Sequence, residues 1–371
     1  TRDVDPATCV AYDKHWRFNR AEADEFYTKY ALPKSLNKPV DPNYSVPVWI
    51  KEYPGSAPST LDQQNALYNY LAPFEDVSGN NTYDWEEGDY PRYNVANTQI
   101  GQGQCKRLLF GDETLFWVFN DKGNNHLESG SPNKIGVEIR GQAFEFATGD
   151  ALNDMTFYPF EILNRSTDIL DSTYFAVWVD ADLGFYNDDY IGCDVGRGLG
   201  FIYNGDAYDE DGQGVVGYKN KLPALGCDFF QGPIADKADG LDNDRDGCTD
   251  CTWQIDKETG LKDTTKPFIT EDSIPETISM SKFTYYNNDF SNNGNPTALV
   301  HYYRYMTSSW KDGTRFRYDN AQGTSASGPV CDYVFPRKSD PLGYGVGGTK
   351  AVPVVMPEWS ERTANNLGKD R

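Results

Sequence analysis

Two runs of residues, LFWVF at 115–119 and GVEIRGQAFEFA at 136–147, carry the clearest strand pattern in this chain of 371 residues. The first is a continuous apolar run, as in a buried strand, and the second alternates apolar with polar residues. Further short strands bounded by Asn, Asp or Gly are predicted at 155–163, 174–179, 200–203 and 280–286. Strands at this spacing predict a mainly β protein with a β-sandwich or jelly-roll-like core.

Helices are expected to be few and short. An Asn-x-x-Glu capping box predicts one over residues 19–30. Ser-Thr begins a second predicted helix over 59–72, and Asn-Pro begins a third over 295–309. We therefore expect residues 1–110 to form a loop-rich region with short helices and an EF-hand-like loop. Residues 111–371 should form a β-sandwich domain with calcium-loop insertions and long loops rich in Asp, Gly and Asn.

The composition argues against some classes of binding partner. Aromatic residues make up 14% of the chain, which favours strands because aromatic rings fit a pleated, half-buried surface. The formal net charge is −22, and neutralising phosphates needs clustered Lys and Arg, so nucleic acid is not an expected partner. No stretch approaches the roughly 20 apolar residues that cross a bilayer, so no membrane span is expected. From the abrupt ends, without Met or signal peptide, we expect a mature or incomplete piece of a longer product.

The cysteine count is odd, so at least one thiol stays unpaired within the chain, and the pairing does not follow from sequence. Their scatter favours some disulfides in an extracellular protein. Cys248-x-x-Cys251 resembles half a zinc site, but no second pair or nearby His completes it. A local disulfide or two free thiols is expected there. The cysteines are Cys9, Cys105, Cys193, Cys227, Cys248, Cys251 and Cys331.

The acidic residues gather in short spacings typical of calcium loops. Ca²⁺ takes six to eight hard oxygen ligands, and residues 76–87 match the twelve-residue calcium-loop template. Asn81 holds the turn position where Gly is usual, and Asn tolerates positive φ. The alternative is an acidic surface loop. The candidate ligands are Asp76, Ser78, Asn80, Thr82 through its carbonyl, Asp84 and Glu87.

A second candidate is the D-x-D-x-D-G pattern that ends at Gly247. Trp253 stands at its twelfth position and cannot ligate, so the missing ligand must come from Asp239 or another loop. The candidate metal residues of this motif are Asp239, Asp242, Asp244, Asp246, Cys248 and Asp250.

A third, looser cluster contains Asp206, Asp209 and Asp211. The nearby acids could be ligands or turn formers; they are Asp180, Asp182, Asp188, Asp189 and Asp194. The cofactor expected for all these loops is Ca²⁺.

Catalytic signatures are scarce. None of the three histidines lies in an H-E-x-x-H arrangement, and no G-x-S-x-G elbow or phosphate-cradling glycine loop is present. The chain is therefore expected not to be an enzyme.

Several stretches together resemble large surface proteins of Bacteroidota that carry a C-terminal sorting domain for type IX secretion. The stretches are 171–194, 196–200, 203–207, 70–74, 87–91, 116–123, 228–233 and 286–289. The resemblance implies export to the cell surface and adhesive, gliding or extracellular-matrix roles. We therefore expect a calcium-stabilised structural or adhesive protein that binds other surface proteins or itself, as a homo-oligomer, filament or layer. The alternative is a carbohydrate-binding or glycan-degrading module.

Overall fold

The chain folds into two compact units. The computed structural model describes residues 5–58, 62, 69–93, 108–122, 133–236, 238–245, 247–255, 262–268, 276–318 and 328–361. The first unit comprises Thr1–Asn125 and Asn133–Asp171, and the second comprises His126–Pro132 and Ser172–Arg371. The first unit therefore continues well past residue 110, where sequence placed the boundary.

The first unit extends past residue 110 because strands from distant parts of this unit pair with one another. β1 (Trp16–Asn19) pairs antiparallel with β4 (Glu113–Asn120), and Phe18 and Phe116 lie in one buried cluster. The loop-rich N-terminal region and the first large sheet thus share a hydrophobic core, and neither would bury its apolar face alone.

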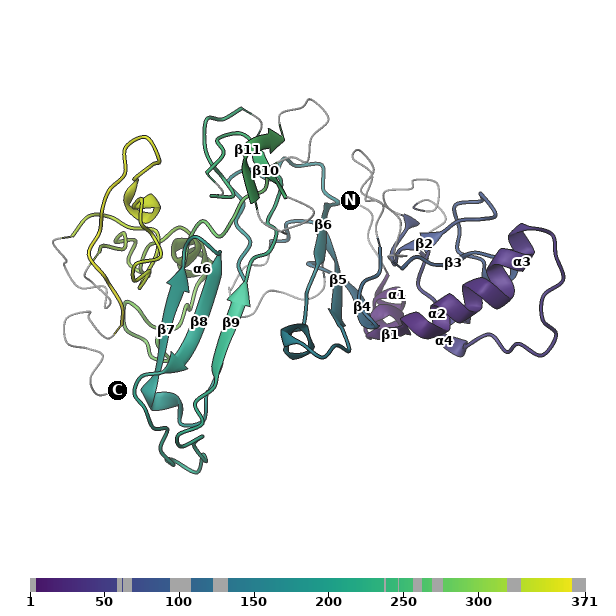
Figure 1. The fold of residues 1–371 in the computed structure, drawn as a ribbon, viewed down its shortest axis with the longest axis horizontal. Coiled ribbons are helices and arrows are strands. Elements are labelled where there is room, and N and C mark those ends of the chain that lie inside the picture. Colours follow the sequence, from purple (N-terminus) through teal and green to yellow (C-terminus); the bar gives the residue numbers. More distant parts are fainter. Residues whose placement is uncertain are drawn as a thin grey trace. The chain divides into compact units, whose positions relative to one another are not determined.

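The sheet of the first unit has four antiparallel strands in the order β1-β4-β5-β6 (Figure 1). β5 spans Val137–Glu145 and β6 spans Phe160–Asn164. The strands predicted at 115–119 and 136–147 are confirmed, and the last part of the 155–163 prediction is β6. β4 alternates between buried and exposed side chains, so it is not the fully buried strand that its apolar run suggested.

The predicted helix after Asn19 is confirmed, because the Asn19 side chain accepts the N–H of Glu22 at 3.1 Å. This helix, α2 (Arg20–Phe26), continues through a π-helical turn at Tyr27–Ala31 into α3 (Leu32–Ser35). The helix predicted over 59–72 lies largely outside the described residues. The remaining elements of this unit are α1 (Pro6–Tyr12), α4 (Val48–Lys51), the paired strands β2 (Phe74–Glu75) and β3 (Tyr90–Pro91), and the 3₁₀ helices Trp85–Glu87 and Ala151–Asp154.

The second unit contains a three-stranded antiparallel sheet, β7 (Asp189–Asp194), β8 (Leu199–Asn204) and β9 (Ala224–Asp228) (Figure 1). β8 confirms the strand predicted at 200–203. Outside this sheet lie the hairpin β10 (Thr252–Ile255) and β11 (Lys262–Phe268), α6 (Leu299–Met306), and the 3₁₀ helices Tyr186–Asp188 and Tyr344–Val346. The fold is therefore mainly β, as predicted. A sandwich is not confirmed, because the two larger sheets belong to different units.

Three local predictions in the second unit differ from the structure. Residues 174–179 form no strand, and 280–286 contributes only isolated bridges such as Phe283 to Tyr333. α6 begins at Leu299 instead of 295, because Ala298 is extended, with φ of −152° and ψ of 155°, and stands outside the helix as its N-cap. No helix in the described part of the chain is long and apolar enough to cross a membrane.

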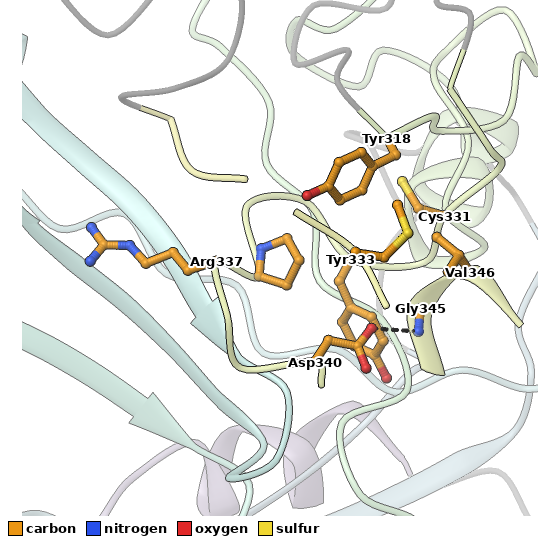
Figure 2. A pocket seen from close by; sticks show the side chains of 9 residues that line it. Tyr318, Cys331, Tyr333, Arg337, Asp340, Gly345 and Val346 are labelled. Atoms are coloured by element: carbon orange, nitrogen blue, oxygen red, sulfur yellow. Dashed lines mark hydrogen bonds between the residues drawn. The ribbon is translucent and has the colours of Figure 1, made fainter. Parts of the chain in front are cut away.

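A small cavity of about 10 Å³ lies in the C-terminal core (Figure 2). Tyr318, Cys331 and Tyr333 line it, and the buried Asp340 accepts the N–H of Gly345 beside it at 2.8 Å. A cavity of this volume holds at most one water molecule. It is a packing feature of the aromatic core and too small for a ligand.

Candidate metal centre

The first predicted calcium loop, residues 76–87, folds around the carboxylate of Asp76. Asp76 Oδ1 accepts the N–H of Gly79 at 2.7 Å, and Oδ2 accepts the N–H of Asn81 at 2.8 Å. Asn81 adopts φ of 61°, so it makes the left-handed turn for which Asn is suited. The Asp76 carboxylate is thus engaged by the backbone of its own loop.

Asp89, which the calcium-loop template does not include, closes this loop from its far end. Asp89 is fully buried; its Oδ1 accepts the N–H of Val77 and its Oδ2 accepts that of Asp84, both at 2.8 Å. Burial raises the pKa of Asp89. The other candidates are used locally or exposed: Ser78 donates to Asp76, Asn80 accepts from Thr82, Asp84 caps Trp85–Glu87, and Glu87 faces solvent.

The acids of this loop do not converge. Within the described residues, three acidic, His or Cys side chains come together at one place, where an oxygen of each of Asp242, Asp244 and Glu276 lies within 4.8 Å of the others. The loop at 76–87 is therefore arranged as a set of backbone caps, and the second motif forms the stronger candidate centre.

The three residues of the third predicted cluster likewise have separate structural roles. Asp206 Oδ1 accepts the N–H of Tyr208 at 2.8 Å, which is an ordinary turn contact. Asp211 is exposed and pairs with Lys219, which lowers the pKa of Asp211. Asp209 is fully buried and lies apart from both of these roles.

The ends of the second motif tie its loop closed. The Asp250 carboxylate accepts the N–H of Gly240 at 3.1 Å, and the Asp250 N–H donates to the Leu241 carbonyl at 3.1 Å. Asp239 Oδ1 accepts the N–H of Leu241 at 2.9 Å, and this bond is the main cause that lowers the pKa of Asp239. Both Asp239 and Asp250 are exposed, so they shape the loop from outside.

Cys248, one of the predicted ligands, cannot bind a metal. It forms a disulfide with Cys251, so it has no thiolate to offer a metal. This agrees with the local disulfide that was one expectation for the Cys-x-x-Cys pair, and the bond braces the end of the acidic loop. Asp246 lies outside the described residues.

The candidate centre joins two segments that are distant in sequence. Asp242 and Asp244 come from the acidic loop, where Asp242 Oδ2 accepts the N–H of Gly247 at 3.0 Å. Gly247 has φ of 90°, a conformation that suits only Gly well and that explains its place in the motif. Glu276 arrives from a second segment, whose Ser279 N–H donates to the Asn243 carbonyl at 3.0 Å.

Glu276 is the decisive side chain of this centre. Only 8% of it is exposed, and its Oε1 accepts the N–H groups of Asn243 and Asp244. Its other oxygen, Oε2, is buried and has no hydrogen-bond partner. A buried carboxylate oxygen without a donor is costly, because the lost hydration is not replaced.

Neighbouring negative charges add to the cost of burying the Glu276 carboxylate. Burial raises the pKa of Glu276, and the neighbouring carboxylates of Asp244 and Asp242 add to the shift. Arg245, the nearest cation in sequence, directs its guanidinium to the Met280 carbonyl at 2.9 Å and lies over the Tyr333 ring. Glu276 therefore sits among like charges, an arrangement that a bound cation would stabilise.

An open depression of about 300 Å³ reaches Asp244 from solvent. Asp244 lines it together with residues 277–279, Arg197 and Asp228. An ion could therefore reach Asp244 without unfolding of the loop. All the available donors are hard oxygens, which suit Ca²⁺ or Mg²⁺ and not a soft metal.

Comparison with family models, with curated proteins and with solved structures found no match to this chain.

Proposed function

We propose that this chain is a calcium-stabilised extracellular protein with a structural or adhesive role, in which Ca²⁺ ties the acidic loop to the segment at Glu276. The observation that carries the proposal is the buried, unpartnered Oε2 of Glu276 beside Asp242 and Asp244. Export by type IX secretion, surface location and partnership with itself or other surface proteins rest on the sequence resemblance alone.

In this proposal, Ca²⁺ holds the long loops in place. A cation shared by Asp242, Asp244 and Glu276 would neutralise three close carboxylates and link two segments more than thirty residues apart. Because these ligands converge only in the folded chain, binding would stabilise the native state by mass action. Extracellular calcium modules bind at about 10⁻⁴–10⁻³ M, so such a protein would hold its loops rigid outside the cell and loosen them at low calcium.

The test compares Glu276→Gln with Glu358→Gln. Glu358 is half exposed and pairs with Lys338 at the surface of the same unit, so its loss should leave calcium binding unchanged. Calcium titration of Glu276→Gln by calorimetry should show one equivalent lost, or one class of site weakened by at least about tenfold. Equal calcium binding by wild type and Glu276→Gln would contradict the proposal.

A further inference from the structure

A second group of acidic side chains gathers where the first two strands of the three-stranded sheet begin and end. Asp188 ends the 3₁₀ helix Tyr186–Asp188, and Asp189 begins β7. Asn204 is the last residue of β8, and its Cα pairs with that of Asp189 in the antiparallel register. The N–H of Gly205 donates to the Asp188 carbonyl at 2.6 Å, which holds the two chain segments together at this end.

Four oxygen atoms of this group are buried without a hydrogen-bond partner. They are both carboxylate oxygens of Asp188, Oδ1 of Asp189 and Oδ1 of Asn204. Asn204 as a whole is only 7% exposed. Native proteins leave few such atoms unsatisfied, and four of those in the described residues belong to this one group, all of them acceptors.

Asp209 faces the same group from the following loop. It is fully buried, and its two oxygens accept the N–H groups of Phe185, at 3.0 Å, and Tyr218. A Cβ at Gly184, where φ is +80°, would lie 2.0 Å from Asp209 Oδ2, and one at Gly217 would lie 2.7 Å from Oδ1. Two glycines are therefore packed directly against this carboxylate and keep it in place.

The electrostatics agree with this geometry. Burial raises the pKa of Asp189 to about 6; the hydrogen bond from the Leu183 N–H opposes this shift, and the charges of Asp188, Asp209 and Asp182 add to it. Burial also raises the pKa of Asp188, and the Asn204 amide is among the groups that oppose this shift. That amide therefore lies beside Asp188, although no hydrogen bond of ordinary geometry joins the two.

Lys219, which lies in the same loop region as Asp209, is already engaged. It pairs with the exposed Asp211, and its ammonium lies 5.8 Å from the centre of the Tyr208 ring. The unpartnered oxygens of Asp188 and Asp189 accept no hydrogen bond from it.

We propose that Asp188, Asp189, Asn204 and Asp209 bind one Ca²⁺ ion at a site separate from the centre at Glu276. Three carboxylates and an amide oxygen provide enough hard ligands for Ca²⁺, with water completing the shell. The three carboxylates here are not as close together as those at Glu276, which all lie within 4.8 Å of one another. What distinguishes this group from the loop at 76–87 is the presence of four buried oxygen atoms without a hydrogen-bond partner. The ion locks the loop after β8 onto the start of β7.

Asp189→Asn tests this site, and Asp211→Asn is the matched control from the exposed pair in the neighbouring loop. Asp189→Asn should bind one equivalent of calcium fewer than wild type by dialysis and elemental analysis, and Asp211→Asn should bind the same amount as wild type. In EDTA, Asp189→Asn should melt at or above the wild-type temperature, because a repelling buried charge is gone. A purely structural carboxylate would instead lower the melting temperature in EDTA. Asp188→Asn is the second variant, with the same expected loss, should Asp189→Asn fold poorly.

The calcium stoichiometry of the variants distinguishes this site from the centre at Glu276. Glu276→Gln should keep the equivalent that Asp189→Asn loses, and the double variant should lose both. Unchanged calcium stoichiometry in both Asp188→Asn and Asp189→Asn would overturn the site and leave the Glu276 centre untouched. Mg²⁺ at the same concentration should restore little, because it demands near-ideal octahedral geometry and gives up its water reluctantly.

Discussion

Glu276 Oε1 accepts the backbone N–H of Asp244 at 3.3 Å, across 32 residues of sequence. This bond places the second carboxylate oxygen of Glu276 beside the Asp side chains of the acidic loop, where it is buried without a donor. The contact makes an isolated acidic loop part of a two-segment centre. The melting behaviour of the protein should therefore depend on calcium.

Removal of calcium with EDTA should lower the melting temperature of the wild-type chain. A ligand that binds only the native state contributes about 2.7 kcal/mol at 100 times its Kd. For a unit of this size, that corresponds to a fall of about 5–10 °C. Differential scanning calorimetry with EDTA, with excess Ca²⁺ and with Mg²⁺ in place of Ca²⁺ measures it. Superimposable curves with EDTA and with Ca²⁺ would contradict a calcium-linked fold.

Calcium should also promote self-association. The chain carries a formal charge of −22, and bound calcium lowers the repulsion between copies. Phe175, Val177 and Trp178 are each more than half exposed and supply apolar area for contact. Light scattering should show larger particles with Ca²⁺ than with EDTA, and Mg²⁺ is the control. A monomer at high protein concentration in excess Ca²⁺ would argue against a filament or layer.

The buried ion pairs of the first unit give a prediction that is independent of calcium. Arg140 is 2% exposed; its Nε donates to Glu138 at 2.8 Å and its Nη1 to the Tyr70 carbonyl at 2.6 Å. Arg140→Met leaves Glu138 with one remaining partner, Arg165, at 2.9 Å. We expect a loss of about 3 kcal/mol in the free energy of unfolding, measured by urea denaturation.

The control for Arg140 is Arg17→Met in the same sheet. The Arg17 side chain is 72% exposed and pairs with Glu113, so its removal should cost less than about 1 kcal/mol. Equal losses for the two variants would show that the buried position of Arg140 does not determine its contribution.

The thiols should differ sharply in reactivity. Cys9 is exposed, whereas Cys193 and Cys331 are buried. Burial raises the pKa of Cys331 to about 12 and raises that of Cys193 strongly, so neither forms the reactive thiolate near neutral pH. Alkylation of the native protein followed by peptide mapping should label Cys9 and spare the other two until denaturant is added. Labelling of Cys193 at the rate of Cys9 would show that its site opens in the native state.

Several local features of the fold could be predicted from sequence because short-range interactions decide them. The Asn19 cap depends on a backbone N–H three residues away, and it forms as predicted. The alternation at 136–147 predicts a strand and β5 forms there, although its most buried side chains are the polar Glu138 and Arg140 and not the apolar Val137 and Ile139. Asn81 adopts positive φ because its own side chain tolerates that conformation.

Other local patterns were overridden by distant contacts. The Asn-Pro pattern at 295 is a sound helix start, but the backbone is extended at Ala298 and α6 begins only at Leu299. The apolar run at 174–179 has the composition of a strand, yet no described strand pairs with it. A strand needs a partner for its backbone groups, and composition does not say whether one is present.

The same distinction between short-range and distant contacts applies to the two candidate centres. The sequence by itself determined the acidic loop, its Gly247 turn and the need for a ligand beyond Trp253, because the template spacing lies within one loop. Only the tertiary structure brought Glu276 to that loop and joined Asp188 and Asp189 to Asn204 and Asp209. Each of those residues lies on a segment whose path is set by strand pairing and burial. Carboxylates distant in sequence converge only when the chain between them has folded.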